Sequence, residues 1–317
     1  MYKKYFPNLN GLRFIGAFMV ILGHLEFIKS LHDIPNLMSI PFYSNTNGHL
    51  GVILFFVLSG FLITYLLMDE LETNKKIDLG KFYMRRILRI WPLYFFMVVV
   101  SIWILPHFFN MIHFELSPYM WSDYEYYLFF IPNLAKASGH YINGAVHLWS
   151  IGVEEQFYLV WPILILIFRK YLFVLLLTVF VGISGLPYFL DFMHSHTSLF
   201  KDEVVFNQLY SFIIHFKINS MAIGGVFAYA FKHQKKWFEF SYNKFVIIFI
   251  CITTLALWLS GILLTSFSDE IYSICFALII YSLSTSPIPL NLIENKFFNF
   301  LGSISYGLYV YHWVIIL

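Results

Sequence analysis

Residues Leu50–Met68 read LGVILFFVLSGFLITYLLM and contain no Asp, Glu, Lys or Arg. A helix that crosses the hydrocarbon core of a bilayer needs about 20 mostly apolar residues, which is nearly the length of this run. The whole chain shares this character, because 59% of its 317 residues are hydrophobic, 21% are aromatic and 12% are charged, with a mean hydropathy of +0.71. Soluble domains carry about twice that charged fraction. The sequence therefore predicts a polytopic membrane protein.

The composition also excludes several classes of protein. A secreted disulfide scaffold, a disordered chain and a conventional nucleic-acid binder all have a different composition. Cys251 and Cys275 both lie inside apolar runs, so they indicate neither a disulfide framework nor a metal site. We therefore expect no bound metal and no nucleic-acid partner, and the lipid bilayer is the first partner that the sequence predicts.

Apolar segments of the required length follow one another along the chain. The first contains Arg13, His24 and Glu26 with no small-residue cleavage site after it, so it is not a cleaved signal peptide. We predict an all-α helix bundle of about nine transmembrane helices, in a single domain over residues 1–317. Because the chain stops at Leu317 within an apolar helix, we expect a tenth helix to be missing by truncation. The predicted segments are 12–29, 50–68, 90–108, 146–168, 171–191, 210–231, 245–264, 271–287 and 301–317.

The distribution of Lys and Arg predicts the orientation of the chain. With the N-terminus in the cytoplasm, the outer side holds Lys29, Lys136 and Lys201, and Lys217 falls ambiguously within a segment. All remaining basic residues then lie on the inner side, and the opposite orientation would invert this asymmetry. The inner residues are Lys3, Lys4, Arg13, Lys75, Lys76, Lys81, Arg85, Arg86, Arg89, Arg169, Lys170, Lys232, Lys235, Lys236, Lys244 and Lys296.

The longest predicted outer loop covers residues 110–145 and is rich in Tyr, Trp, Asn and His. Its 121–134 stretch, WSDYEYYLFFIPNL, is too short and too polar to span a bilayer. Because Trp and Tyr favour the level of the lipid headgroups, we predict an interfacial or re-entrant segment. Glu26 and Lys29, near the outer end of the first segment, are expected to be interfacial as well.

Four polar side chains from four predicted helices fall at one depth near the middle of the membrane. With a rise of about 1.5 Å per residue, His24 lies roughly 16 Å above the inner boundary and Glu154 roughly 10 Å below the outer one. In a core about 30 Å thick these depths agree within a few ångströms, and Ser59 and His312 fall at similar depth. Ionisable groups within a span are costly and usually functional. We therefore predict a water-lined cavity in which His24 and Glu154 face each other.

Each of these polar residues also has a structural interpretation. His24 and Glu154 could form a buried pair that fixes helix register, although apolar residues would do so at lower cost in lipid. Ser59 could bond back to its own helix, and the Ser59-Gly60 pair allows close helix packing, so both interpretations of Ser59 stay open. For His312, a functional role is only slightly favoured over a structural one.

A basic cluster, Arg85-Arg86-Ile87-Leu88-Arg89, precedes the third segment. Arg86 and Arg89 are three residues apart and share a helical face. Such clusters are common as cytoplasmic anchors of membrane helices. The alternative is an anion site, because planar guanidinium groups bind phosphate with two parallel hydrogen bonds. The cluster alone leaves both interpretations open.

These residues lie in stretches that resemble the acyltransferase family 3 of membrane proteins, over essentially the whole chain. One stretch alone is weakly specific, but five in the correct order are highly specific. The sequence departs from the family pattern in two ways. It has Asn10 where the family often has aspartate, and the family's tenth helix with its short glutamate-proline signature is missing. The stretches are NLNGLR at 8–13 followed by His24, FFVLSGFL at 55–62, RILRIWPLY at 86–94, HLWSIGVEEQFY at 147–158 and GSISYGLY at 302–309 followed by His312.

The resemblance implies transfer of an acyl group, most often acetyl, from cytoplasmic acyl-CoA to a hydroxyl of a glycan or glycolipid, in the bacterial cytoplasmic membrane. His24 would be the general base, and Glu154 would orient its imidazole and stabilise the protonated ring. No tightly bound cofactor is implied, acetyl-CoA or another acyl-CoA is the donor substrate, and proteins of glycan synthesis are candidate partners. The implied supporting residues are Arg13, Ser59, Trp149, Ser150, Tyr306 and His312. The implied acyl-CoA-binding residues are Arg86, Arg89 and Arg85.

The rival class is a transporter or flippase for a polysaccharide or lipid-linked sugar, because polar residues at the midplane are also typical of transport proteins. The sequence shows neither repeated halves nor paired broken helices, and transport gives no special reason for an arginine site of the phosphate-binding type. Within the enzyme class, another acyl group such as succinyl could replace acetyl.

Overall fold

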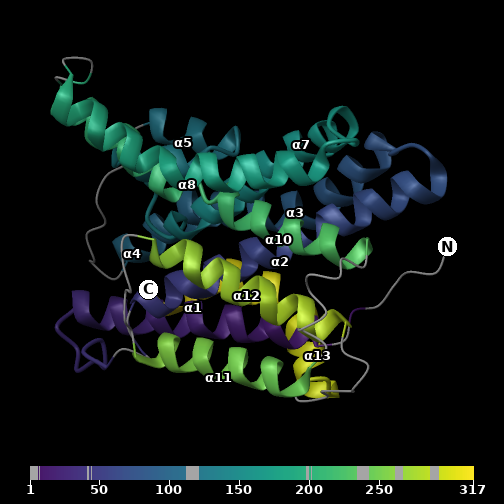
Figure 1. The fold of residues 1–317 in the computed structure, drawn as a ribbon. Coiled ribbons are helices and arrows are strands. Elements are labelled where there is room, and N and C mark those ends of the chain that lie inside the picture. Colours follow the sequence, from purple (N-terminus) through teal and green to yellow (C-terminus); the bar gives the residue numbers. More distant parts are fainter. Residues whose placement is uncertain are drawn as a thin grey trace. The chain divides into compact units, whose positions relative to one another are not determined.

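The computed structural model describes residues 6, 8–40, 43, 45–111, 121–197, 200, 202–233, 243–260, 267–285 and 293–317. Every regular element within these ranges is a helix (Figure 1). Among them, six are long and apolar enough to cross a membrane: Leu9–Leu31, Thr46–Asn74, Leu79–Met111, Val146–Ile167, Leu172–His196 and Glu203–Lys232. The predicted all-α polytopic membrane fold is thus confirmed, whereas the number of nine spans stays a prediction.

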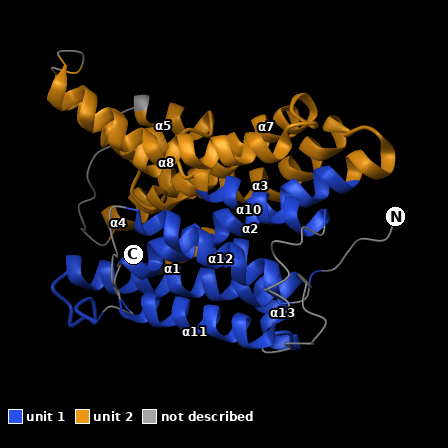
Figure 2. Ribbon diagram, in the orientation of Figure 1, with its two compact units in different colours: residues 1–69, 220–309, 316 blue, residues 70–219, 310–315, 317 orange. Residues whose placement is uncertain are grey.

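The chain divides into two compact units (Figure 2). Unit 1 comprises residues 1–69, 220–309 and 316, and unit 2 comprises 70–219, 310–315 and 317. Three helices therefore have residues in both units. They are α2 (Asn45–Asn74), α10 (Ile218–Lys232) and α14 (Ser305–Ile316).

Glycines allow the helices of unit 1 to pack closely. A Cβ atom added at Gly51 of α2 would lie 2.7 Å from the Gly16 carbonyl oxygen of α1 (Leu9–Leu31). One added at Gly60 would lie 1.9 Å from the Met221 carbonyl oxygen of α10, so only glycine fits there. This contact supports the close-packing interpretation of the Ser59-Gly60 pair. The unit also contains α11 (Lys244–Ser260), α12 (Ser268–Thr285) and α13 (Lys296–Ser303).

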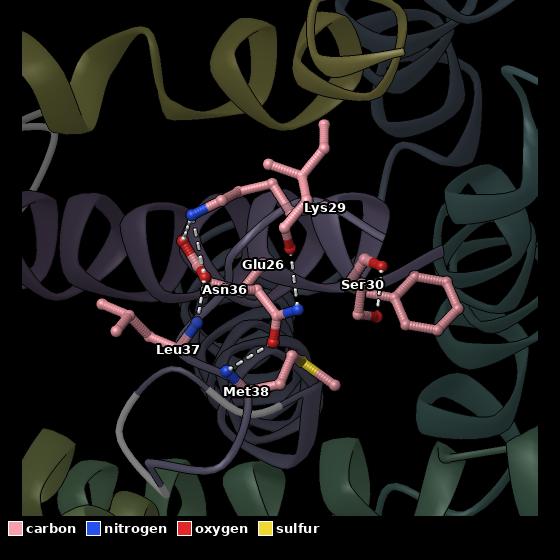
Figure 3. Close-up of polar contacts among 8 residues, drawn as sticks. Glu26, Lys29, Ser30, Asn36, Leu37 and Met38 are labelled. Carbon is pink, nitrogen blue, oxygen red and sulfur yellow. Dashed lines mark hydrogen bonds and ion pairs between the residues drawn. The ribbon is translucent and has the colours of Figure 1, made fainter. Parts of the chain in front are cut away.

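A buried carboxylate holds the segment that follows α1 (Figure 3). Glu26 accepts hydrogen bonds from the Lys29 ammonium at 2.9 and 3.1 Å and from the Leu37 backbone N–H at 2.6 Å. The pair that the sequence places at the membrane interface therefore fixes the path of the chain after the helix.

Unit 2 is built from one long helical run, several short helices and two further long helices. The long run is α3 (Leu79–Val99), which continues through the π-helical turn η2 (Val100–Ile104) into α4 (Leu105–Met111). The other elements are α5 (Trp121–Leu128), α6 (Pro132–Ser138), the 3-10 turn η3 (Val146–Leu148), α7 (Trp149–Ile167), α8 (Leu172–His196) and α9 (Glu203–His215).

The differences from the predicted segments that bear on the site concern three of them. The predicted segment 90–108 begins eleven residues earlier, at Leu79, so the arginine cluster is inside the helix rather than before it. The predicted segment 210–231 is interrupted, because Phe216 has φ −82° and ψ 69° and the Lys217 N–H bonds the His215 carbonyl at 3.0 Å. Residues 301–317 do not form one helix either, since α13 ends at Ser303 and α14 begins at Ser305.

The 121–134 stretch contains α5 and the start of α6, both of which are too short to span a bilayer, as expected. Phe130, between them, has a positive φ of 56°, which is uncommon for an aromatic residue. Its ring stacks on Tyr94 with centroids 4.4 Å apart, and its carbonyl accepts a hydrogen bond from the Gln156 amide at 2.9 Å. These contacts fix the α5–α6 turn against α3 and α7.

Candidate functional site

The start of α7 carries the most characteristic of the sequence stretches, and α6 packs directly on it. A Cβ atom added at Gly152 would lie 2.5 Å from Cδ of Pro132, the first residue of α6. Asn133 and Gln156 exchange side-chain hydrogen bonds at 3.3 and 2.9 Å across the same contact. Gly152 is therefore required for α6 to approach α7 this closely.

Arg86 and Glu154, which the sequence assigns to different roles, are close neighbours in unit 2. The Tyr158 hydroxyl donates to Glu154 Oε2 at 3.3 Å, one turn along α7. The Arg86 guanidinium carbon lies 5.3 Å from the ring centroid of Tyr158 and 5.6 Å from that of Phe82. Tyr158 therefore contacts both side chains. The structure thus brings together the candidate donor-binding arginine and the candidate catalytic carboxylate.

Glu155 lies beside these residues, although no role was predicted for it. The Trp91 indole N–H donates to Glu155 Oε2 at 2.9 Å. Two buried atoms beside it, Glu155 Oε1 and Arg86 Nε, have no hydrogen-bond partner among the residues that the structure describes. Buried polar atoms are nearly always satisfied, so these two atoms are free to accept a hydrogen bond from a bound molecule or donate one to it. We refer to Arg86, Trp91, Glu154, Glu155 and Tyr158 as the α3–α7 cluster.

The other two arginines of the basic cluster are exposed. Arg85, with a side chain 58% exposed, lies 3.9 Å from a Glu70 carboxylate oxygen. Arg89 is exposed as well. Of the three arginines predicted to bind acyl-CoA, Arg86 is therefore the one placed against α7.

Two buried histidines of unit 2 meet at the other end of the same stretch. The ring centroids of His147 and His312 are 5.0 Å apart, and the His147 ring stacks parallel to Trp313. His147 Nε2 lies 3.0 Å from the Val310 carbonyl oxygen, which only accepts hydrogen bonds, so Nε2 is the protonated nitrogen. The sequence indicated His312 but missed His147, and its position at the start of the HLWSIGVEEQFY stretch was the available signal.

Trp149 and Ser150, two of the predicted supporting residues, make different contacts. Ser150 donates to the His147 carbonyl at 3.3 Å, which is a local bond at the start of a helix. Trp149 is buried, with the Lys136 ammonium 4.4 Å above its ring and the His215 ring edge-on at 5.2 Å. Trp149 therefore belongs to a second cluster, formed by α6, α7 and α9.

The remaining predicted residues, Arg13, His24, Ser59 and Tyr306, belong to unit 1 and are half-buried. The Arg13 guanidinium donates to the Asn10 side-chain oxygen at 2.9 Å, so Asn10 serves as an acceptor where the family often has an acid. Because His24 lies in unit 1 and Glu154 in unit 2, the pairing of these two residues stays a prediction.

The family follows from comparison with known proteins. The sequence profile of a family described as an acyltransferase domain, Acyl_transf_3, matches residues 6–317. The chain belongs to acyltransferase family 3. A peptidoglycan O-acetyltransferase of Listeria monocytogenes, OatA, is 30% identical to it over 174 residues, which are 53% of this chain and 25% of the relative. The O-acetyltransferase OatA of Staphylococcus aureus is 33% identical over 169 residues, which are 51% of this chain and 25% of the relative.

The aligned part is thus about a quarter of the length of each of these relatives. No solved structure matches the chain significantly.

Proposed function

We propose that this family 3 acyltransferase is a membrane-embedded O-acetyltransferase that uses cytoplasmic acetyl-CoA to acetylate a hydroxyl of a cell-wall glycan or its lipid-linked precursor. The names of both relatives support acetyl as the acyl group, and the name of the Listeria monocytogenes relative supports peptidoglycan as the acceptor class. The observation that carries the proposal is the α3–α7 cluster. It combines an arginine suited to phosphate, a carboxylate suited to acid–base chemistry, and buried polar atoms that a substrate can satisfy.

The donor binds at the inner side of the membrane in this proposal. The excess of Lys and Arg in the predicted inner segments supports a cytoplasmic N-terminus in a bacterial cell. Arg86 then holds a phosphate of coenzyme A with its planar guanidinium. The neutral acyl arm extends along α7 from the level of Tyr158 toward Glu154, a rise of about 6 Å over four residues.

The chemical step uses His24 as general base and Glu154 as its orienting carboxylate, on the strength of their matching depths in the sequence. The acceptor hydroxyl oxygen attacks the thioester carbonyl carbon while His24 removes the hydroxyl proton. The carbon–sulfur bond then breaks, and the departing thiolate takes the proton from the imidazolium. The products are the acetyl ester and free coenzyme A, and both side chains return to their starting state.

Transport of a glycan without acyl transfer is the weaker proposal. The interrupted α9–α10 segment resembles the broken helices of transporters. Membership of an acyltransferase family favours acyl transfer over transport.

Transfer of labelled acetyl groups tests the proposed function. Membrane vesicles with and without the protein are incubated with acetyl-CoA labelled in the acetyl group, and label is followed into extracted glycan. We expect incorporation of label only with the protein, and only when acetyl-CoA is supplied to the membrane face that was cytoplasmic in the cell. Equal incorporation with and without the protein contradicts an enzyme, and equal use of donor from the outer face contradicts the orientation.

A further inference from the structure

Lys136 is a half-buried cation whose charge the described chain does not neutralise. It lies in α6, and its ammonium sits 4.4 Å above the centre of the Trp149 ring. Within the ranges that the structure describes, no carboxylate comes within ion-pair distance of it. Asp123, the buried acid of the neighbouring α5, is engaged by His140 at 3.0 Å. The local acid is therefore not the counter-ion of Lys136.

Burial makes this charge costly in the absence of a ligand. Loss of water around the ammonium lowers the pKa of Lys136 from its usual 10.5 to about 8. The face of an indole ring stabilises a cation, but an anion with direct hydrogen bonds does so more strongly. An anion that binds beside Trp149 would supply the stabilisation that the described residues do not.

The surroundings of Trp149 also favour an anion. The His215 ring contacts the edge of Trp149, and its Nδ1 lies 2.7 Å from the Ser211 carbonyl. Since a carbonyl only accepts, Nδ1 is the protonated nitrogen of the neutral ring. The second group of this cluster therefore brings no negative charge.

The place where Lys136 contacts α7, at Trp149, distinguishes it from the donor site. Trp149 precedes Glu154 by five residues and Tyr158 by nine, which correspond to about 7.5 and 13.5 Å along the helix axis. Lys136 therefore marks one end of this stretch, Arg86 packs at the other, and Glu154 lies between them in the same unit. With the donor phosphate at Arg86, the Lys136 end is left for the acceptor.

We propose that Lys136 binds an anionic group of the acceptor, a carboxylate on the glycan or a phosphate of its lipid carrier. The inference rests on the proposed function, because it assigns the acceptor side of that same reaction. It predicts that this enzyme selects acceptors by charge, and that Trp149 and His215 support the selecting ammonium without contacting the reacting atoms.

The test compares acceptors that differ in charge, at saturating acetyl-CoA. The acceptors are an N-acetylglucosamine tetrasaccharide, a tetrasaccharide of alternating N-acetylglucosamine and N-acetylmuramic acid, and a polyprenyl-diphosphate-linked N-acetylglucosamine disaccharide. The wild-type protein should have a KM at least about tenfold lower for one of the anionic acceptors than for the neutral one, the effect of one charge-assisted contact. Preference for the muramic acid acceptor identifies a carboxylate, and preference for the lipid-linked acceptor identifies the phosphate.

Variants then assign the preference to one side chain. Lys136→Met should remove the preference for the anionic acceptor while the KM for acetyl-CoA is unchanged, and Lys136→Arg should retain most of it. Lys170→Met, at an exposed lysine after α7, is the matched control and should behave as wild type. The normal donor KM of Lys136→Met also shows that the variant is folded.

The outcomes separate this inference from the proposed function. Absence of acetyl transfer by wild-type protein to all three acceptors overturns the proposed function and the inference with it. Transfer to all three with equal KM overturns only the role of Lys136, and this result needs no variant. A preference that survives in Lys136→Met overturns it as well.

Discussion

Replacing Arg86 by alanine tests the donor side of the proposed reaction. The Arg86 guanidinium lies between the rings of Phe82 and Tyr158, at 5.6 and 5.3 Å, and its buried Nε has no acceptor in the described chain. If a phosphate of coenzyme A occupies this position, the substitution removes a charge-assisted hydrogen bond worth about 1.5–3 kcal/mol. Because 1.4 kcal/mol is a factor of ten, the Kd of acetyl-CoA should rise about 10- to 100-fold.

Calorimetric titration of acetyl-CoA into the purified protein measures this change. Arg86→Lys should recover only part of the affinity, since an ammonium lacks the planar fork that matches phosphate. Arg85→Ala should cost less than Arg86→Ala, because the Arg85 side chain is 58% exposed. Lys81→Ala, at a side chain 77% exposed one turn earlier on α3, is the matched control. An unchanged Kd in correctly folded Arg86→Ala would refute the donor site and leave the arginines as membrane anchors.

Three further changes have defined outcomes. Gly60→Ala forces a Cβ atom against the backbone and should lower the free energy of unfolding by about 1–3 kcal/mol, measured by thermal or denaturant unfolding. A Cβ atom at Gly182 meets nothing within 4 Å, so Gly182→Ala should not destabilise the protein. Glu155→Gln keeps an acceptor for the Trp91 indole N–H but removes the negative charge. The free energy of unfolding should therefore be unchanged while the turnover of acetyl-CoA falls. A variant with the turnover of the wild type would limit Glu155 to a structural role. The pKa of Lys136 is about 8 in the folded state, below its usual 10.5. Between pH 8 and 10.5 the unfolded chain therefore binds more protons than the folded chain, so the free energy of unfolding should rise with pH over this range. The rise in Tm should be smaller in Lys136→Met, and equal rises would contradict the burial of this ammonium.

Apolar composition was sufficient to predict the helices but not where they are interrupted. The run Leu50–Met68 lies wholly inside α2, because a membrane leaves an uncharged run of this length little alternative to a helix. The break at Phe216 lies in a less apolar stretch, between His215 and Lys217, and no Pro or Gly marks it. It depends on backbone bonds between neighbouring residues and on the packing of α9 against α6, which a sequence pattern does not record.

The same limit applies to the candidate site. The depth of residues along the helices was enough to predict Glu154. Successive residues of a helix point about 100° apart, so the contact of Glu155 with Trp91 depends on the direction of each side chain around α7. Lys136 was one of three outer lysines without a role, because its contact with Trp149 requires the α5–α6 segment to fold back onto α7. Tertiary packing therefore identified both residues.

The most direct test of the proposed reaction is a double-mutant comparison of His24 and Glu154, with acetyl transfer divided by the amount of correctly folded protein. His24→Ala should lose about two to four decades of specific activity, the usual contribution of a general base. Glu154→Gln should also fall steeply, and the double variant should be little worse than the worse single variant, because the two residues act as a unit. Near-normal specific activity in His24→Ala, with only the yield of folded protein reduced, would contradict the account.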